Sequence, residues 1–238
     1  MQEWEYQDTG QYKLINLDKD ESSIVRRALY QRSQAGEQAI RRLVLAIQDE
    51  HGLPDARIMK PCWWANAWPL LYWAKDQRAA GSTEVYGPIL DFLLEGVPTS
   101  DLSLPRDLLR PAVVDCEIDI LVEDSDYFAF LEVKISTPDE QARFPFHRNR
   151  ICVKGEYYSV HQMVRQYVQG RMLQKKRLLP HKTFALATVG AHNEQPSEIE
   201  LNGTERELLG LVGEGDKESL VIIDLPLKTL TGAALSAP

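Results

Sequence analysis

Cysteine is scarce in this chain, and its spacing fits neither a disulfide framework nor a structural zinc site. The 238 residues contain three cysteines, Cys62, Cys116 and Cys152, and none of them forms a C-x-x-C pair. Disulfide-rich secreted domains and zinc ribbons depend on closely spaced cysteines. We therefore expect neither class, and a cytoplasmic location is the expectation.

Long hydrophobic runs and a leader-like start are also missing. Continuous apolar runs such as residues 43–47 are far shorter than the roughly 20 residues that span a bilayer. The first eight residues include three acids and no base, unlike the basic start of an export peptide. The sequence predicts no membrane partner and no export.

Positive charge is in the minority, yet it is concentrated in one segment. The chain carries a net charge of −8, but residues 141–182 alone carry +9 and the remainder −17. Such a block is either a solvated helix face or a surface that contacts phosphates. Its place beside the acidic motif described below favours the second reading, with nucleic-acid contacts assigned to Arg143, Arg148, Arg150, Lys154 and Arg165.

The length and composition predict a compact globular protein. Hydrophobic residues make up 44% and charged residues 26% of the chain, which is ordinary for a packed domain. A length of 238 residues suits one decorated domain. We expect residues 1–81 to form a helical N-terminal elaboration that packs on a core at 82–238, which ends in a helix and a strand.

Helical spacing dominates the first part of the chain. Apolar residues recur at helical intervals over 22–50, and a second helix is expected over 82–95. Four of the five tryptophans fall within 61–80, where one or two short helices interrupted at Pro69 are expected. The Trp-rich segment 61–75 could stack bases, but core or an interface with a protein partner or second copy is the favoured reading.

After residue 113 the spacing changes to the alternation that is typical of strands. Apolar and polar residues alternate over 114–121, and residues 127–135 read as a second strand, so the two predict a hairpin. The remaining expectations are a long basic loop over 136–156, a helix over 159–176, a strand over 183–189, a helix over 204–212 with a capping box between Thr204 and Glu207, and a strand over 220–225.

Chemistry-bearing residues gather on the predicted hairpin. Glu132 and Lys134 are two positions apart and therefore lie on one face of a strand, about 7 Å apart. Asp119 lies on the preceding strand, where pairing could bring its carboxylate beside Glu132. Carboxylate oxygens are hard ligands that suit Mg²⁺, and a nearby lysine can orient or deprotonate a water.

These residues resemble the PD-(D/E)xK nuclease superfamily, through Ile118-Asp119 and then Glu132-Val133-Lys134. The resemblance implies a restriction-endonuclease-like α/β fold, with an αβββαβ core and a mixed central sheet flanked by helices. It implies metal ligation by Asp119, Glu132 and the carbonyl of Val133, with Lys134 acting on the nucleophilic water. Ile118 stands where the superfamily name has proline.

The resemblance extends to two neighbouring helices. Many members follow the E-x-K strand with a Q-x-x-x-Y element; here Gln162 precedes Tyr167 by one residue too many. Gln162 is therefore a candidate active-site residue, and core is favoured for Tyr167. For an acid from the first core helix, Glu84 is preferred over Glu37. Glu117 is read as a salt-bridge partner of the basic block or as a further ligand.

The sequence thus predicts a nuclease dependent on Mg²⁺ or Mn²⁺ that hydrolyses nucleic acid, with DNA favoured. The alternative is a catalytically idle binding or scaffold subunit that keeps the fold within a larger bacterial defence or DNA-repair assembly. The acidic remainder of the chain and the Trp-rich segment favour a protein partner in that case. Cleavage with and without a divalent metal separates the two hypotheses.

Overall fold

The protein has a mixed α/β architecture. The computed structural model describes residues 62–67, 90–91, 94–95, 103–123, 127–134, 148–176, 183–190 and 198–226. Within these ranges no helix has the length and apolar character needed to cross a bilayer. The expected helix over 22–50, with Glu37, lies outside the described residues, as do Glu84 and Arg143.

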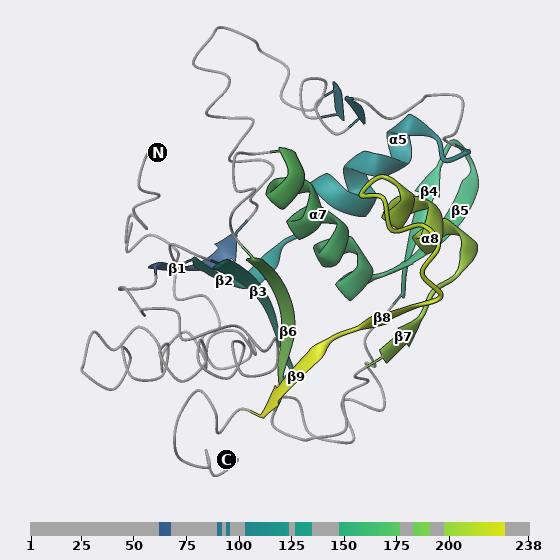
Figure 1. Ribbon diagram of the computed structural model, residues 1–238. Coiled ribbons are helices and arrows are strands. Elements are labelled where there is room, and N and C mark those ends of the chain that lie inside the picture. The colour runs from purple at the N-terminus through teal and green to yellow at the C-terminus, as the bar shows by residue number, and fades with distance from the viewer. Residues whose placement is uncertain are drawn as a thin grey trace, which may run out of the picture.

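A five-stranded mixed sheet forms the centre of the fold (Figure 1). Its spatial order is β1-β2-β3-β6-β9. The first three strands form antiparallel pairs, whereas β6 pairs parallel with β3 and β9 pairs parallel with β6. Their bounds are β1 Cys62–Ala67, β2 Ile118–Glu123, β3 Tyr127–Lys134, β6 Thr183–Gly190 and β9 Ile223–Pro226.

The parallel neighbours β3 and β6 are joined through the helix α7, Gln162–Lys176. Two parallel strands cannot be joined by a tight turn and need such a crossover. Phe128 and Phe130 of β3 and Phe184 of β6 form an aromatic cluster, with ring centroids 5.0 to 5.8 Å apart. Tyr167 of α7 joins it at 5.8 Å from Phe184, so this cluster seats the helix on the sheet.

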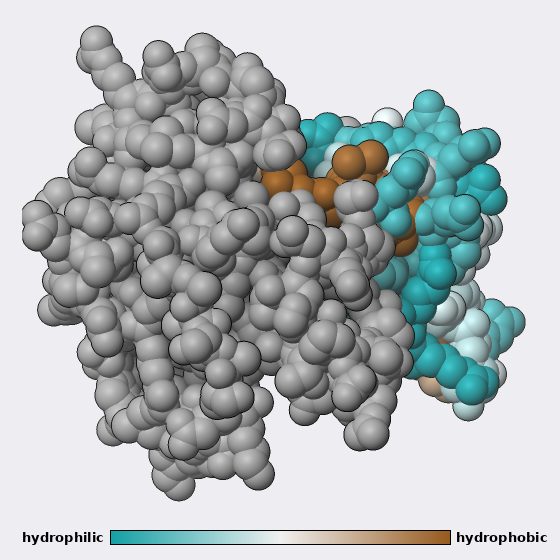
Figure 2. All heavy atoms as spheres, turned by 90° about the horizontal axis from the view of Figure 1, so that it is seen from below, coloured by the Kyte–Doolittle hydropathy of each residue, from teal (hydrophilic) through white to brown (hydrophobic). Residues whose placement is uncertain are grey.

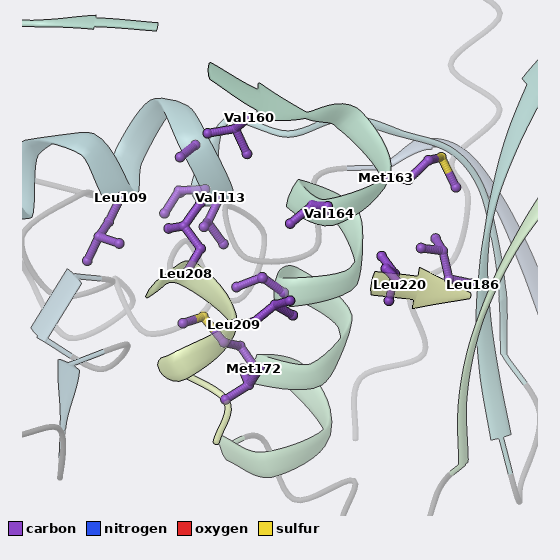
Figure 3. Packing of buried hydrophobic residues seen from close by; sticks show 14 of the residues in the cluster. Leu109, Val113, Val160, Met163, Val164, Met172, Leu186, Leu208, Leu209 and Leu220 are labelled. Carbon is purple, nitrogen blue, oxygen red and sulfur yellow. The ribbon is translucent and has the colours of Figure 1, made fainter. Parts of the chain in front are cut away.

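The main core lies around α7, which is covered on both sides. Figure 3 shows Leu186 of β6 on one side of the helix and Leu208 and Leu209 on the other. The second side is built by α5 (Arg106–Leu109), the π-helical turn η3 (Arg110–Val114) and α8 (Gly203–Gly210). Side chains at the centre are fully or almost fully buried: Leu108, Leu109, Val113, Val164, Val168, Leu208 and Leu209.

The segment between β3 and α7 contains an antiparallel hairpin. Strands β4, Arg148–Val153, and β5, Glu156–His161, are joined by Lys154 and Gly155, both with positive φ, at 50° and 89°. Two positive φ values are typical of the tight hairpin turns that follow strand twist. The expected basic loop over 136–156 is therefore wrong for 148–156. Along β4, exposed side chains alternate with more buried ones, as is typical of a strand. The sequence did not indicate this strand, because Arg148, Asn149 and Arg150 have no preference for strands.

The C-terminal part also differs from the sequence-based expectation. The helix over 204–212 is present as α8, but Asn202 and Glu205 form its capping box, not Thr204 and Glu207. The single strand expected over 220–225 is two strands. One is β8, Ser219–Val221, paired with β7, Glu198–Glu200; the other is β9 in the central sheet.

Other expectations were confirmed or corrected. The hairpin of 114–121 with 127–135 is confirmed as β2 and β3, and the strand over 183–189 as β6. Val114 ends the helical segment η3 and the strand begins only at Ile118, so 114–117 are not strand, and residues 159–161 belong to β5 and not to the helix. A helix was expected over 61–80, but residues 62–67 form β1, where the pairing of Trp63 with Val122 and Trp64 with Leu121 outweighs local spacing.

On the side shown in Figure 2, the part of the surface formed by the described residues is mainly polar. There the described residues are mostly hydrophilic, and hydrophobic residues gather in one strip. Among described large hydrophobic side chains, Tyr157 and Val221 are exposed, at 60% and 74%. The apolar residues of the described part are thus used mainly inside the fold.

Candidate active site

Glu132 of β3 is a buried carboxylate held by two amides from α7. Its side chain is 1% exposed. Gln162 Nε2 donates to Oε1 at 2.8 Å, and Gln166 Nε2 donates to Oε2 at 2.7 Å. Residues four apart on a helix lie on one face, which is why both amides reach the same carboxylate. A buried carboxylate without donors would be very costly, so these bonds fix its position.

Asp119 directly precedes Ile120, the first residue of β2 with a partner in β3, and Glu132 directly follows that partner, Leu131. The β2–β3 ladder pairs Ile120 with Leu131, so one further step along the same register would set Asp119 opposite Glu132. Opposite residues of an antiparallel pair lie on one face with Cβ atoms about 4.5–5.5 Å apart. Asp119 is partly exposed and Glu132 is buried. The paired residues end at Ile120 and Leu131, so the juxtaposition of the two carboxylates stays a prediction.

Glu132 also has neighbours on the other side of β3, in the parallel strands β6 and β9. The ladders pair Glu132 with Thr188 of β6 and Thr188 with Asp224 of β9. Lys134, the last residue of β3, stands two positions after Glu132 and pairs with Gly190, while Val133 pairs with Val189. The carboxyl ends of β3 and β6 and the amino end of α7 thus meet at one edge, as they do where open α/β sheets bind ligands.

Further polar groups of α7 anchor it to the turn before β2. Arg165 donates to the carbonyls of Pro111, at 2.8 Å, and Ala112, at 3.1 Å. Gln169 Nε2 donates to the carbonyls of Val113 and Cys116, at 2.8 and 3.2 Å. Pro111, Ala112 and Val113 lie in the last turn of the helical segment, where carbonyls have few partners within the helix, so α7 supplies donors to them. The Val113 carbonyl also accepts from the Cys116 N–H, at 3.4 Å. The anchors set the position of Gln162 and Gln166 relative to the sheet.

Cys116 lies near the site as a protonated thiol. Burial raises its pKa to about 12, and the carboxylates of Glu132 and Asp119 add to this, while Arg165 opposes it. The reactive form of cysteine is the thiolate. Cys116 is therefore unsuited to act as a nucleophile or thiolate ligand near neutral pH.

Four of the five residues predicted to contact nucleic acid lie in the described part of the chain, and each has different neighbours. Arg148 pairs with the buried Glu205, at 3.1 Å, and donates to the carbonyl of Glu200. Lys154 pairs with Asp107 at 2.9 Å. Arg165 is bound to backbone carbonyls, as described above. Arg150 lies over the ring of Tyr157, at 3.7 Å from its centroid. Arg148, Lys154 and Arg165 thus have partners within the chain, and their contact with nucleic acid stays a prediction.

Sequence reasoning missed Gln166, the second amide on Glu132. Its signal was its spacing of four residues from Gln162, which puts both on one helix face. Gln166 is fully buried, and its Oε1 has no hydrogen-bond partner among the described residues; the same holds for Oε1 of Gln169. Glu117 contributes through its backbone carbonyl, which accepts from Gln166 at 3.3 Å.

The donor set suits a hard cation without forming a dense acidic cluster. The described residues contain no group of three or more His, Cys, Asp or Glu side chains that could hold a metal ion. Both carboxylate oxygens of Glu132 accept a hydrogen bond from an amide, and a carboxylate oxygen can accept more than one contact. Together with Asp119 and the unpartnered Oε1 of Gln166, the oxygens are of the type that Mg²⁺ prefers.

Comparison of this chain with family models, with curated proteins and with solved structures found no match in any of the three. The functional argument therefore depends on the contacts of the chain itself.

Proposed function

We propose that the protein is a nuclease dependent on Mg²⁺ or Mn²⁺, with a PD-(D/E)xK-type core. The central-sheet strands β1, β2, β3 and β6, with α7 before β6, follow the order βββαβ, and β6 is parallel to β3. The segments α5 and η3 are inserted before β2, and the β4–β5 hairpin is inserted before α7. Asp119 lies on the second of these strands, and Glu132 and Lys134 lie on the third. This order of elements and residues supports a restriction-endonuclease-like fold.

The observation that carries the proposal is the Glu132 carboxylate, which is buried and held by Gln162 and Gln166. Asp119 would lie opposite it if the β2–β3 register continues by one step. A folded protein gains little stability from a buried acid near the carboxyl end of a central strand, where an apolar residue would pack at lower cost. The two amides fix both carboxylate oxygens. Such fixed oxygens are what a catalytic site needs, because charge stabilisation depends on groups already in position.

Asp119, Glu132 and the carbonyl of Val133 would hold the cation. When bound, Mg²⁺ polarises a phosphoryl oxygen and lowers the pKa of a water. Lys134 orients that water or neutralises charge that develops on the phosphate. Gln162 and Gln166 keep the Glu132 carboxylate in one rotamer, and the bonds of Arg165 and Gln169 to backbone carbonyls keep α7 in place. Glu84 stays a candidate further ligand.

A cleavage assay tests the proposal. Purified protein is incubated with plasmid, single-stranded DNA and RNA, each with Mg²⁺, with Mn²⁺ or with a chelator. We expect metal-dependent cleavage that Asp119→Ala and Lys134→Ala abolish. Glu198→Ala is the matched control, because Glu198 is an exposed acid on β7. Cleavage by Asp119→Ala and Lys134→Ala at the rate of the wild type would refute the proposal.

A second candidate function is an idle nuclease fold that works as a binding subunit. The favouring observation is that Glu132 is 1% exposed and both of its oxygens already accept hydrogen bonds within the chain. In that case Glu132 would be a structural acid that fixes α7 on the sheet. No cleavage with any divalent metal, together with copurification of a stable protein partner, would select this function.

A further inference from the structure

The outer face of the β4–β5 hairpin is an exposed ribbon that the catalytic proposal does not use. Arg150 and Cys152 of β4 point outward, and Tyr157 of β5 is 60% exposed. On the inner face, Val153 and Val160 are buried in the core. The ribbon is therefore held on the body of the protein by its inner side chains, while its outer side chains are presented to solvent.

Arg150 and Tyr157 form a stacked pair on this outer face. The guanidinium carbon lies 3.7 Å from the centroid of the tyrosine ring. The register pairs Arg150 with Ser159 and Tyr157 with Cys152, so the two side chains are diagonal neighbours across the ribbon. One face of the ring is covered by the guanidinium, and much of the rest of the side chain stays open. The tight turn at Lys154 and Gly155 fixes this arrangement.

The charge on this face is partly unbalanced. Arg148 is paired with Glu205 and Lys154 with Asp107. In the part of the chain that the structure describes, Arg150 has no carboxylate partner. It lies in the segment 141–182, which carries +9 within a chain of net charge −8. An unbalanced arginine beside an exposed aromatic ring suits a ligand that offers a phosphate and a flat base together.

We propose that the outer face of the β4–β5 ribbon binds single-stranded nucleic acid. Tyr157 stacks on an unpaired base, and the Arg150 guanidinium donates to the adjacent phosphate. The inference rests on the proposed function, since it names the class of substrate on which the proposed nuclease would act. Unpaired bases expose the faces that stack on aromatic rings, whereas duplex bases are stacked on each other. Strand β5 continues directly into Gln162 of α7, which contacts Glu132, so the ribbon and the proposed site are joined in the chain.

Fluorescence anisotropy tests the inference in a chelator, so that no metal-dependent cleavage interferes. The probes are labelled single-stranded DNA, single-stranded RNA and a DNA duplex of equal length. We expect single strands to bind more tightly than the duplex. Tyr157→Ala should weaken single-strand binding by about tenfold or more, whereas Tyr157→Phe keeps it, because loss of one stacked base has that scale. Arg150→Ala should weaken binding and reduce the salt dependence by about 0.7 in slope.

Two exposed residues elsewhere are the matched controls. Val221→Ala removes an exposed hydrophobic side chain of β8, and Arg206→Ala removes an exposed arginine of α8. Both should bind like the wild type, and circular dichroism checks that all variants are folded. Unchanged single-strand binding in folded Tyr157→Ala and Arg150→Ala overturns the inference, as does a wild type that binds no single strand or prefers duplex.

The test separates this inference from the nuclease proposal. Single-strand binding that depends on Tyr157, without cleavage under any metal, supports the ribbon and refutes the nuclease. Metal-dependent cleavage that requires Asp119 and Lys134, with binding independent of Tyr157 and Arg150, supports the nuclease and refutes the ribbon.

Discussion

Gly170 of α7 lies directly against the ring of Phe184 in β6. A Cβ atom at position 170 would come within 2.1 Å of the Cζ atom of Phe184. Real Cβ atoms do not approach this closely, so the helix lies on the sheet only because residue 170 has no side chain. The ring in turn belongs to the aromatic cluster with Phe128, Phe130 and Tyr167.

Gly170→Ala is therefore expected to destabilise the fold, although alanine is the better helix former. Overpacking of a core costs about 1–3 kcal/mol, which exceeds the gain of about 1 kcal/mol from helix propensity. Urea denaturation measures the difference. Gly210→Ala in α8 is the control, because a Cβ there meets nothing within 4 Å. A Gly170→Ala protein as stable as Gly210→Ala would contradict the packing of α7 on β6.

Gln166→Glu should destabilise the protein at neutral pH and much less in acid. At neutral pH it puts a second carboxylate beside the buried Glu132 and removes the donor at 2.7 Å. Like charges at this distance disfavour ionisation of both groups, so one proton would be taken up on folding. The variant's stability relative to the wild type should therefore improve as the pH falls from 7 to 4.

Denaturation curves at several pH values measure this dependence. Gln174→Glu is the matched control, because Gln174 lies on the same helix and accepts a hydrogen bond from Arg171. It should be close to neutral at pH 7. If Gln166→Glu were as stable as Gln174→Glu at pH 7, Gln166 would not contact the Glu132 carboxylate.

Glu214 should contribute stability at neutral pH that is lost in acid. Although burial raises its pKa, hydrogen bonds from Lys217, Tyr167 and Arg171 outweigh this and hold the pKa below its ordinary value. A group whose folded pKa is lowered stabilises the fold above its unfolded pKa, about 4.3, and this contribution disappears as the pH falls through the folded value. Glu214→Gln should be less stable than the wild type at pH 7, and the two stabilities should converge below about pH 4. A gap that is constant with pH would contradict this.

The sequence was most informative where spacing and chemistry coincide. The alternation before Asp119 and around Glu132 predicted the β2–β3 hairpin, which is present, and one further step of its register would set the two acids opposite each other. Gln162 was selected from a helix motif, and it does reach Glu132. These features depend on neighbours in one or two adjacent elements, which a single sequence expresses directly.

Other features depend on contacts between distant segments, which local spacing does not reveal. Residues 62–67 looked helical but pair with β2, more than 50 residues later. Arg148 and Arg165 looked like phosphate contacts in a basic run, yet one pairs with Glu205 and the other with carbonyls at the end of η3. Their partners lie 57 and 53 positions away, so no pattern within the basic segment indicated them.

The central claim is that Asp119 of β2 and Glu132 of β3 together form a cation site near the carboxyl end of β3. Calorimetric titration of the full chain with Mn²⁺, without nucleic acid, tests it most directly. Binding to the wild type, lost in Asp119→Asn and in Glu132→Gln and unchanged in Glu198→Gln, is the predicted result. Equal Mn²⁺ binding by all four proteins, or none by the folded wild type, would contradict the account.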